Sequence, residues 1–79
     1  MNSNLSNRRL TDLQENQWGE IVQFSDETMA CRMMSMGILP GSCICMLKKA
    51  PMNGGVCLRI DNNKVALRSN EADSILIKG

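Results

Sequence analysis

The chain has 79 residues, of which 43% are hydrophobic and 22% charged, and its formal net charge is +1. This length is enough for one small domain, and the near-neutral charge argues against nucleic acid as a partner, because nucleic-acid-binding proteins carry a strong basic excess. No apolar run approaches the roughly 18–20 residues that cross a bilayer, and the polar N-terminus lacks the apolar core of a secretory signal. The sequence therefore predicts a cytoplasmic protein without a membrane span, whose cysteines stay reduced.

The N-terminal half is expected to contain a flexible segment, a strand and a helix. Residues 1–9 are polar and predict a frayed end, so the domain should begin at residue 10 and run to residue 79. Apolar residues from Trp18 to Phe24 predict the first strand. Ser25 or Asp26 can then accept hydrogen bonds from the free amide groups of a following helix. The helix is therefore expected to start near Asp26.

The helical pattern continues until a glycine and a proline interrupt it. One face of the predicted helix carries Met29, Ala30, Met33 and Met36, at steps of one, three and four. Gly37 suits the left-handed residue that ends a helix, and Pro40 prevents the helix from restarting. The four apolar residues are therefore expected to face the core.

After Gly41 the pattern changes to that of short strands. Alternation predicts that Ile44 and Met46 face the core, as do Val56, Leu58 and Ile60. Turn residues at 51–55 and 61–63 separate the strands. The remaining elements are a strand at 65–67, a short helical turn at 69–73 and a final strand at 74–78. We therefore predict a mostly β fold with five short strands, one helix after the first strand and a helical turn before the last, curled into a barrel to avoid open edges.

Three segments in order resemble the FeoA family. They are MMSMGILPGS at 33–42, APMNGG at 50–55 and VALRSNEADSILI at 65–77. The resemblance extends from about Leu10 to Ile77. It implies an SH3-like small barrel in the cytoplasm that acts as an accessory of ferrous iron transport. The implied partner is FeoB, a membrane permease with a GTPase domain, which would recruit the protein to the inner face of the cell membrane.

The residues themselves argue against an enzyme. The sequence contains no histidine, which removes the commonest general acid–base group and the usual partner of a serine or cysteine nucleophile. The acidic residues are scattered, and Gly54-Gly55 is too short to cradle a phosphate. The sequence therefore favours an interaction module. A second copy of the chain is one partner that this class allows.

Cysteines on predicted strands raise an alternative, a small metal-binding or metal-sensing protein. If Ile44 and Met46 point inward, then Cys43, Cys45 and Cys57 point outward together. Three thiolates on one face would bind a transition metal, and they suit zinc or cuprous copper better than iron. The spacing differs from the C-x-x-C pair of structural zinc sites. The other interpretation is that the cysteines are small apolar residues on a face covered by a partner.

The predicted partner contacts are apolar or backbone-exposing residues at the edges of the barrel. An exposed Met34 beside Leu39 and Met52 would form an adaptable apolar patch of the kind used for docking. The full set consists of Met34, Leu39, Pro40, Gly41, Met52, Asn53, Gly54 and Gly55. A charge placed at Leu39 should therefore disrupt docking.

Overall fold

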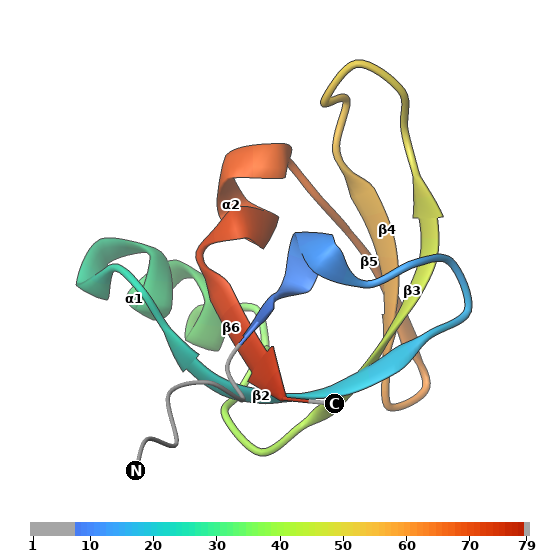
Figure 1. Cartoon of the computed structure of the whole chain (residues 1–79). Helices are drawn as coiled ribbons and strands as arrows, with labels where there is room; N and C mark the ends of the chain where they lie inside the picture. Colours follow the sequence, from blue (N-terminus) through green and yellow to red (C-terminus); the bar gives the residue numbers. More distant parts are fainter. Residues whose placement is uncertain (1–7, 79) are drawn as a thin grey trace, which may run out of the picture.

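A computed structural model describes residues 8–78 of the chain (Figure 1). Most of the segment that was predicted to be frayed lies outside these residues. The helices among them are too short to span a bilayer. In chain order, the elements are β1 (Arg8–Arg9), a 3₁₀ helix (Leu10–Asp12), β2 (Trp18–Phe24), α1 (Glu27–Ser35), β3 (Cys43–Lys49), β4 (Val56–Ile60), β5 (Asn63–Leu67), α2 (Ser69–Asp73) and β6 (Ile75–Lys78).

The strands form one strongly curved antiparallel sheet with the order β1-β6-β2-β3-β4-β5 (Figure 1). The prediction of a mostly β fold is confirmed, but the described residues form six strands and not five. The missed strand is β1, in which Arg8 and Arg9 pair with Ile77 and Leu76 of β6. Two residues are too few to show alternation, so the sequence pattern could not reveal this strand.

The sheet is open, because its outer strands β1 and β5 do not pair with each other. The expectation of a barrel without edges is therefore not met by strand pairing among residues 8–78. Other features reduce the unpaired backbone that the sheet edges expose. One edge strand, β1, is only two residues long. Lys64 also lies exposed on β5. Short edge strands and exposed lysines both reduce the tendency of an edge to pair with another chain.

Helix α1 begins as the sequence predicts. Asp26 is the N-cap, and its carboxylate accepts hydrogen bonds from the backbone amides of Thr28 and Met29. Met33 is fully buried, whereas Met36 is 48% exposed, so the expectation that Met36 faces the core was wrong. Met36 is the C-cap, outside the helical residues, and its position no longer follows the helical period.

The core lies on the concave side of the sheet, under the helices. Its buried residues include Ile44 and Met46 of β3 and Leu58 and Ile60 of β4, as the alternation predicts, whereas Val56 is only partly buried. The cluster comprises Leu10, Leu13, Ile21, Met33, Ile38, Ile44, Met46, Leu58, Ile60, Leu67, Ala72, Ile75 and Ile77. Because α1 contributes Met33 alone to this set, the helix depends on its end contacts as well as on packing.

Helix α2 is tied to α1 by Glu71, which is only 8% exposed. Its carboxylate accepts a hydrogen bond from the Arg68 backbone amide at 2.9 Å. The other carboxylate oxygen lies 3.3 Å from the Arg32 guanidinium on α1. This carboxylate therefore fixes both the start of α2 and the position of α1 relative to it.

Candidate functional site

The end of α1 is held by a Schellman motif. The Ile38 amide donates to the Met33 carbonyl at 2.9 Å, and the Gly37 amide donates to the Met34 carbonyl at 3.0 Å. Gly37 has φ +85°, the left-handed conformation that this motif needs. Ile38 and Met33 are both fully buried, which supplies the apolar contact that accompanies the motif. The chain therefore leaves the helix in a fixed direction.

The next four residues form a tight turn that is fastened to β2. The Ser42 amide donates to the Leu39 carbonyl at 3.1 Å across Pro40 and Gly41. Gly41 has φ +91°, which with proline before it is typical of a type II turn. The Gly41 amide also donates to the Ile21 carbonyl at 2.7 Å. The turn thus has little freedom to move relative to the sheet.

Three apolar side chains project from this rigid end of α1. Met34 is 43% exposed, Met36 is 48% exposed and Leu39 is 46% exposed. We call these three residues the helix-end surface. Met34 and Leu39 were predicted contacts, whereas Met36 was missed because the helical period placed it in the core. Exposed apolar residues grouped in this way are typical of a docking surface.

The second predicted group lies at the tip of the β3–β4 hairpin. Met52 is 97% exposed, and Asn53 and Gly54 are also exposed. Met52 and Asn53 have φ +58° and +59°, and the Gly54 amide donates to the Pro51 carbonyl, as in a type I′ turn. Gly55 is buried against β5. A methionine at positive φ is unusual, because its side chain crowds the backbone there.

The two predicted groups do not form one patch. Residues 39–41 precede β3 and residues 52–55 follow it, so they lie at opposite ends of this strand (Figure 1). A strand of seven residues is about 20 Å long. The expectation that Met34 and Leu39 lie beside Met52 was therefore wrong. The length of β3 could have shown this from the sequence.

The three strand cysteines are not placed alike. Cys45 lies on the outward side of the sheet, as the alternation predicts, but it is only 5% exposed, whereas Cys43 is exposed and Cys57 is half-buried. Across the strands, Cys45 faces Trp18 on one side and Arg59 on the other. Paired residues share a face of the sheet, so these two large side chains flank the small thiol and cover it.

The register places neither of the other two thiols directly opposite Cys57. A bulge between Met46 and Lys48 places Lys48, not Leu47, opposite Cys57. Within residues 8–78, no three cysteine, aspartate or glutamate side chains are grouped so that they could hold a metal ion. The geometry thus gives the metal-binding interpretation no preformed set of three ligands.

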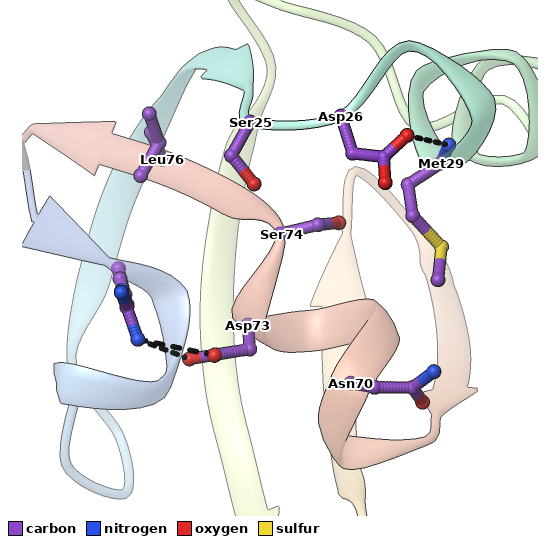
Figure 2. A pocket seen from close by; sticks show the side chains of 8 residues that line it. Ser25, Asp26, Met29, Asn70, Asp73, Ser74 and Leu76 are labelled. Atoms are coloured by element: carbon purple, nitrogen blue, oxygen red, sulfur yellow. Dashed lines mark hydrogen bonds and ion pairs between the residues drawn. The ribbon is translucent and has the colours of Figure 1, made fainter.

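A hollow of about 300 Å³ lies where α1, α2 and β6 meet (Figure 2). Figure 2 shows Asp26 and Met29 on one side of it and Asn70, Asp73 and Ser74 on the other. The Asp73 carboxylate lies 3.1 Å from the Arg9 guanidinium and accepts a hydrogen bond from the Thr11 hydroxyl at 3.0 Å. Asp26 caps α1. These carboxylates stabilise the fold, and sequence reasoning missed the hollow because three segments far apart in the sequence form it.

The chain was compared with known proteins. A sequence profile of the FeoA domain matches residues 8–79. A search of curated proteins finds no significant match. A FeoA-like protein from Clostridium acetobutylicum is 27% identical and superposes with a TM-score of 0.84, over 92% of this chain and 86% of that one.

Further solved structures share the fold. A zinc complex of FeoA from Stenotrophomonas maltophilia, described as an SH3 domain protein, is 21% identical with a TM-score of 0.76, over 90% of this chain and 89% of that one. A manganese-dependent transcriptional repressor is 26% identical with a TM-score of 0.82, over 91% of this chain. The chain spans only 41% of the repressor's length. The profile match covers nearly the whole sequence and is accompanied by an SH3-like fold, so this chain belongs to the FeoA family, a family of small accessory domains associated with ferrous iron transport.

Proposed function

We propose that this protein is a non-enzymatic accessory of ferrous iron uptake that docks on the cytosolic part of the FeoB GTPase-permease and tunes its assembly or activity. Family membership supports the link to iron transport. The observation that carries the docking role is the helix-end surface, in which Met34, Met36 and Leu39 stand exposed on a rigid loop. In this reading the loop 39–41 presents the main contact.

The energetics suit an anchor within a larger interface. Fully burying a leucine or methionine side chain contributes about 1.5–3 kcal/mol, so three half-exposed side chains contribute about 2–5 kcal/mol. A micromolar complex needs about 8 kcal/mol beyond the cost of association. The helix-end surface would therefore supply part of the affinity. Its Schellman motif and type II turn reduce the entropy lost on binding, because the loop is already ordered.

The hairpin tip is a second, separate contact in this proposal. Met52 is almost fully exposed on a turn with positive φ, and it adds an apolar group that packs against nothing in residues 8–78. Asn53 and Gly54 present their backbone beside it. Gly55 contributes through the shape of the hairpin, since it is buried. One partner could contact both groups only if its surface extends about 20 Å along β3.

Binding to the purified cytosolic GTPase domain of the permease tests the proposal. Leu39→Asp places a charge in the helix-end surface and should weaken binding at least tenfold, measured by calorimetry. Met52→Asp is measured separately, because it reports on the second proposed contact at the hairpin tip and not on the helix-end surface. Circular dichroism of each variant confirms that the fold persists. Wild-type affinity in both Leu39→Asp and Met34→Asp, with intact folds, would remove the helix-end surface from the interface.

The alternative, a metal-binding or metal-sensing protein that uses Cys43, Cys45 and Cys57, has weaker support. Cys45 is buried, and neither Cys43 nor Cys45 lies opposite Cys57 in the strand register. Zinc titration with a count of reactive thiols discriminates between the two functions. Protection of three thiols by one equivalent of zinc would favour the alternative over the docking proposal.

A further inference from the structure

A row of paired residues crosses four strands of the sheet. Trp18 on β2 pairs with Cys45 on β3, Cys45 pairs with Arg59 on β4, and Arg59 pairs with Lys64 on β5. Directly opposed residues in an antiparallel sheet share a face. The intervening residues Ile44, Leu58 and Ile60 are buried in the core, so the row lies on the opposite, outward side. We call this side the outer sheet face.

Trp18 is the large apolar group of this face. Its side chain is 55% exposed, although it stands beside the buried Cys45. Tryptophan is strongly enriched among the residues that dominate binding energy at protein interfaces. About half of the Trp18 surface is in contact with water, so a second apolar group can pack against its indole ring.

The cations of this face are not used by the fold. Arg59 and Lys64 belong to the row, and Lys48 lies opposite Cys57 on the same face. None of these three side chains makes a hydrogen bond or ion pair within residues 8–78, whereas Arg9 and Arg32 each pair with a carboxylate. Glu20 shares the face, but its cross-strand neighbour is Lys78, which offsets its charge.

We propose that the outer sheet face binds an acidic peptide segment of a partner protein. An apolar residue of the segment packs on Trp18, and its carboxylates pair with Arg59 and Lys64, while Lys48, opposite Cys57, adds positive charge beside the row. Adjacent strands lie about 4.8 Å apart, so Arg59 stands about 10 Å from Trp18 and Lys64 about 14 Å. An extended peptide covers these distances in about three and four residues. Only alternate side chains of an extended peptide face the sheet, so the segment is an apolar residue followed by carboxylates two and four positions later, within reach of the long Arg59 and Lys64 side chains.

Nucleic acid is the less suitable partner for this face. The chain has a net charge of only +1, and Trp18 is its only tryptophan, with no tyrosine. Single-stranded nucleic acid is bound through several stacked rings along a strongly basic groove. The proposal concerns a surface other than the helix-end surface, and it does not depend on the permease being the partner.

The single tryptophan makes the test direct, because Trp18 is both the anchor of the proposed site and the only strong fluorophore. The probe is a synthetic peptide with one Phe followed two and four positions later by Glu, so that all three side chains face the sheet. We expect it to shift Trp18 emission to shorter wavelength. Binding should weaken when NaCl is raised from about 50 to about 300 mM, because the ionic contacts are screened. A peptide with Gln in place of Glu should bind at least about threefold more weakly.

Two charge-removing variants localise the effect. Arg59→Gln should weaken binding about threefold, within the range for an exposed ion pair, while Arg32→Gln removes an equal charge from α1 and should leave it unchanged. Equal binding of the Glu and Gln peptides, or equal effects of the two variants, would overturn the proposal. So would an emission shift caused by a single-stranded oligonucleotide or an anionic lipid vesicle but not by the Glu peptide. None of these results bears on binding to the permease.

Discussion

Gly55 gives the sharpest test of how the hairpin is joined to the sheet. It has φ +108°, and a Cβ added there would lie 2.6 Å from the Leu67 carbonyl oxygen on β5. Gly37 also has positive φ, at +85°, but nothing lies within 4 Å of its added Cβ. Both positions disfavour alanine because of the backbone conformation, and only Gly55 adds a collision with backbone atoms. Comparing the two substitutions therefore isolates the cost of the collision.

The expected magnitudes follow from these two terms. A left-handed conformation costs a non-glycine residue about 1–2 kcal/mol, which is the whole expected effect of Gly37→Ala. Gly55→Ala adds about 1–3 kcal/mol, because the β5 backbone must shift to make room. The free energy of unfolding of a chain this size is about 4–12 kcal/mol. Gly55→Ala should thus remove a large part of it, about 2–5 kcal/mol in total.

Thermal unfolding followed by circular dichroism measures the difference. For a domain of this size, 1 kcal/mol corresponds to about 4–8 °C in Tm. Gly55→Ala should therefore melt at least about 5 °C below Gly37→Ala. Gly41→Ala is a second control, since Gly41 has φ +91° and open space around its added Cβ. If Gly55→Ala melts at the same temperature as the two controls, the close approach of Gly55 to β5 is not the constraint we describe.

Three further predictions concern the helices and the thiols. Asp26→Ala should lower the free energy of unfolding by about 1 kcal/mol, because the amides of Thr28 and Met29 lose their acceptor, and Asp26→Asn should restore most of it in urea unfolding. Glu71→Ala should lower the free energy of unfolding by about 1–3 kcal/mol, since it leaves the Arg68 amide without its acceptor. Arg32→Ala should lower it by less than about 1 kcal/mol, because the Arg32 side chain is 63% exposed. Equal losses of the two variants in urea unfolding would argue against this assignment of roles. An alkylating reagent should modify Cys31 and Cys43 rapidly and Cys45 slowly, as measured by mass spectrometry. Trp18→Ala should selectively increase the rate of Cys45 modification, because Trp18 pairs with Cys45 across the strands. An unchanged rate at Cys45 would show that Trp18 does not cover this thiol.

Local signals predicted the helix and its end correctly. Asp26 before the helix, Gly37 after it and Pro40-Gly41 in the next turn each act through their own backbone or the nearest amides, so their roles can be read without knowing the fold. Alternation identified Ile44, Met46 and Leu58 as inward residues for the same reason. The error at Met36 arose where the helical period was extended one residue past the end of α1.

The candidate site was only partly predictable. Leu39 and Met34 were correctly expected to be exposed, because a turn and the outer side of a helix usually face solvent. Their separation from Met52 was missed, although the length of β3 implies it. The hollow of Figure 2 could not be foreseen, since its residues come from three segments that only the folded chain brings together.

The sequence by itself determined most of the elements, because hydrophobic period, capping residues and turn residues act over a few neighbouring positions, whereas β1 is too short to show a pattern. Only the tertiary structure decided which residues of different strands face each other. The bulge in β3 moved Cys57 opposite Lys48, and the pairing of β2 with β3 placed Trp18 beside Cys45. Strand register depends on how the whole sheet packs over its core, so no local pattern fixes it. For this reason alternation alone suggested a set of three cysteine ligands, whereas the strand pairing shows which residues of different strands stand together on the outer sheet face.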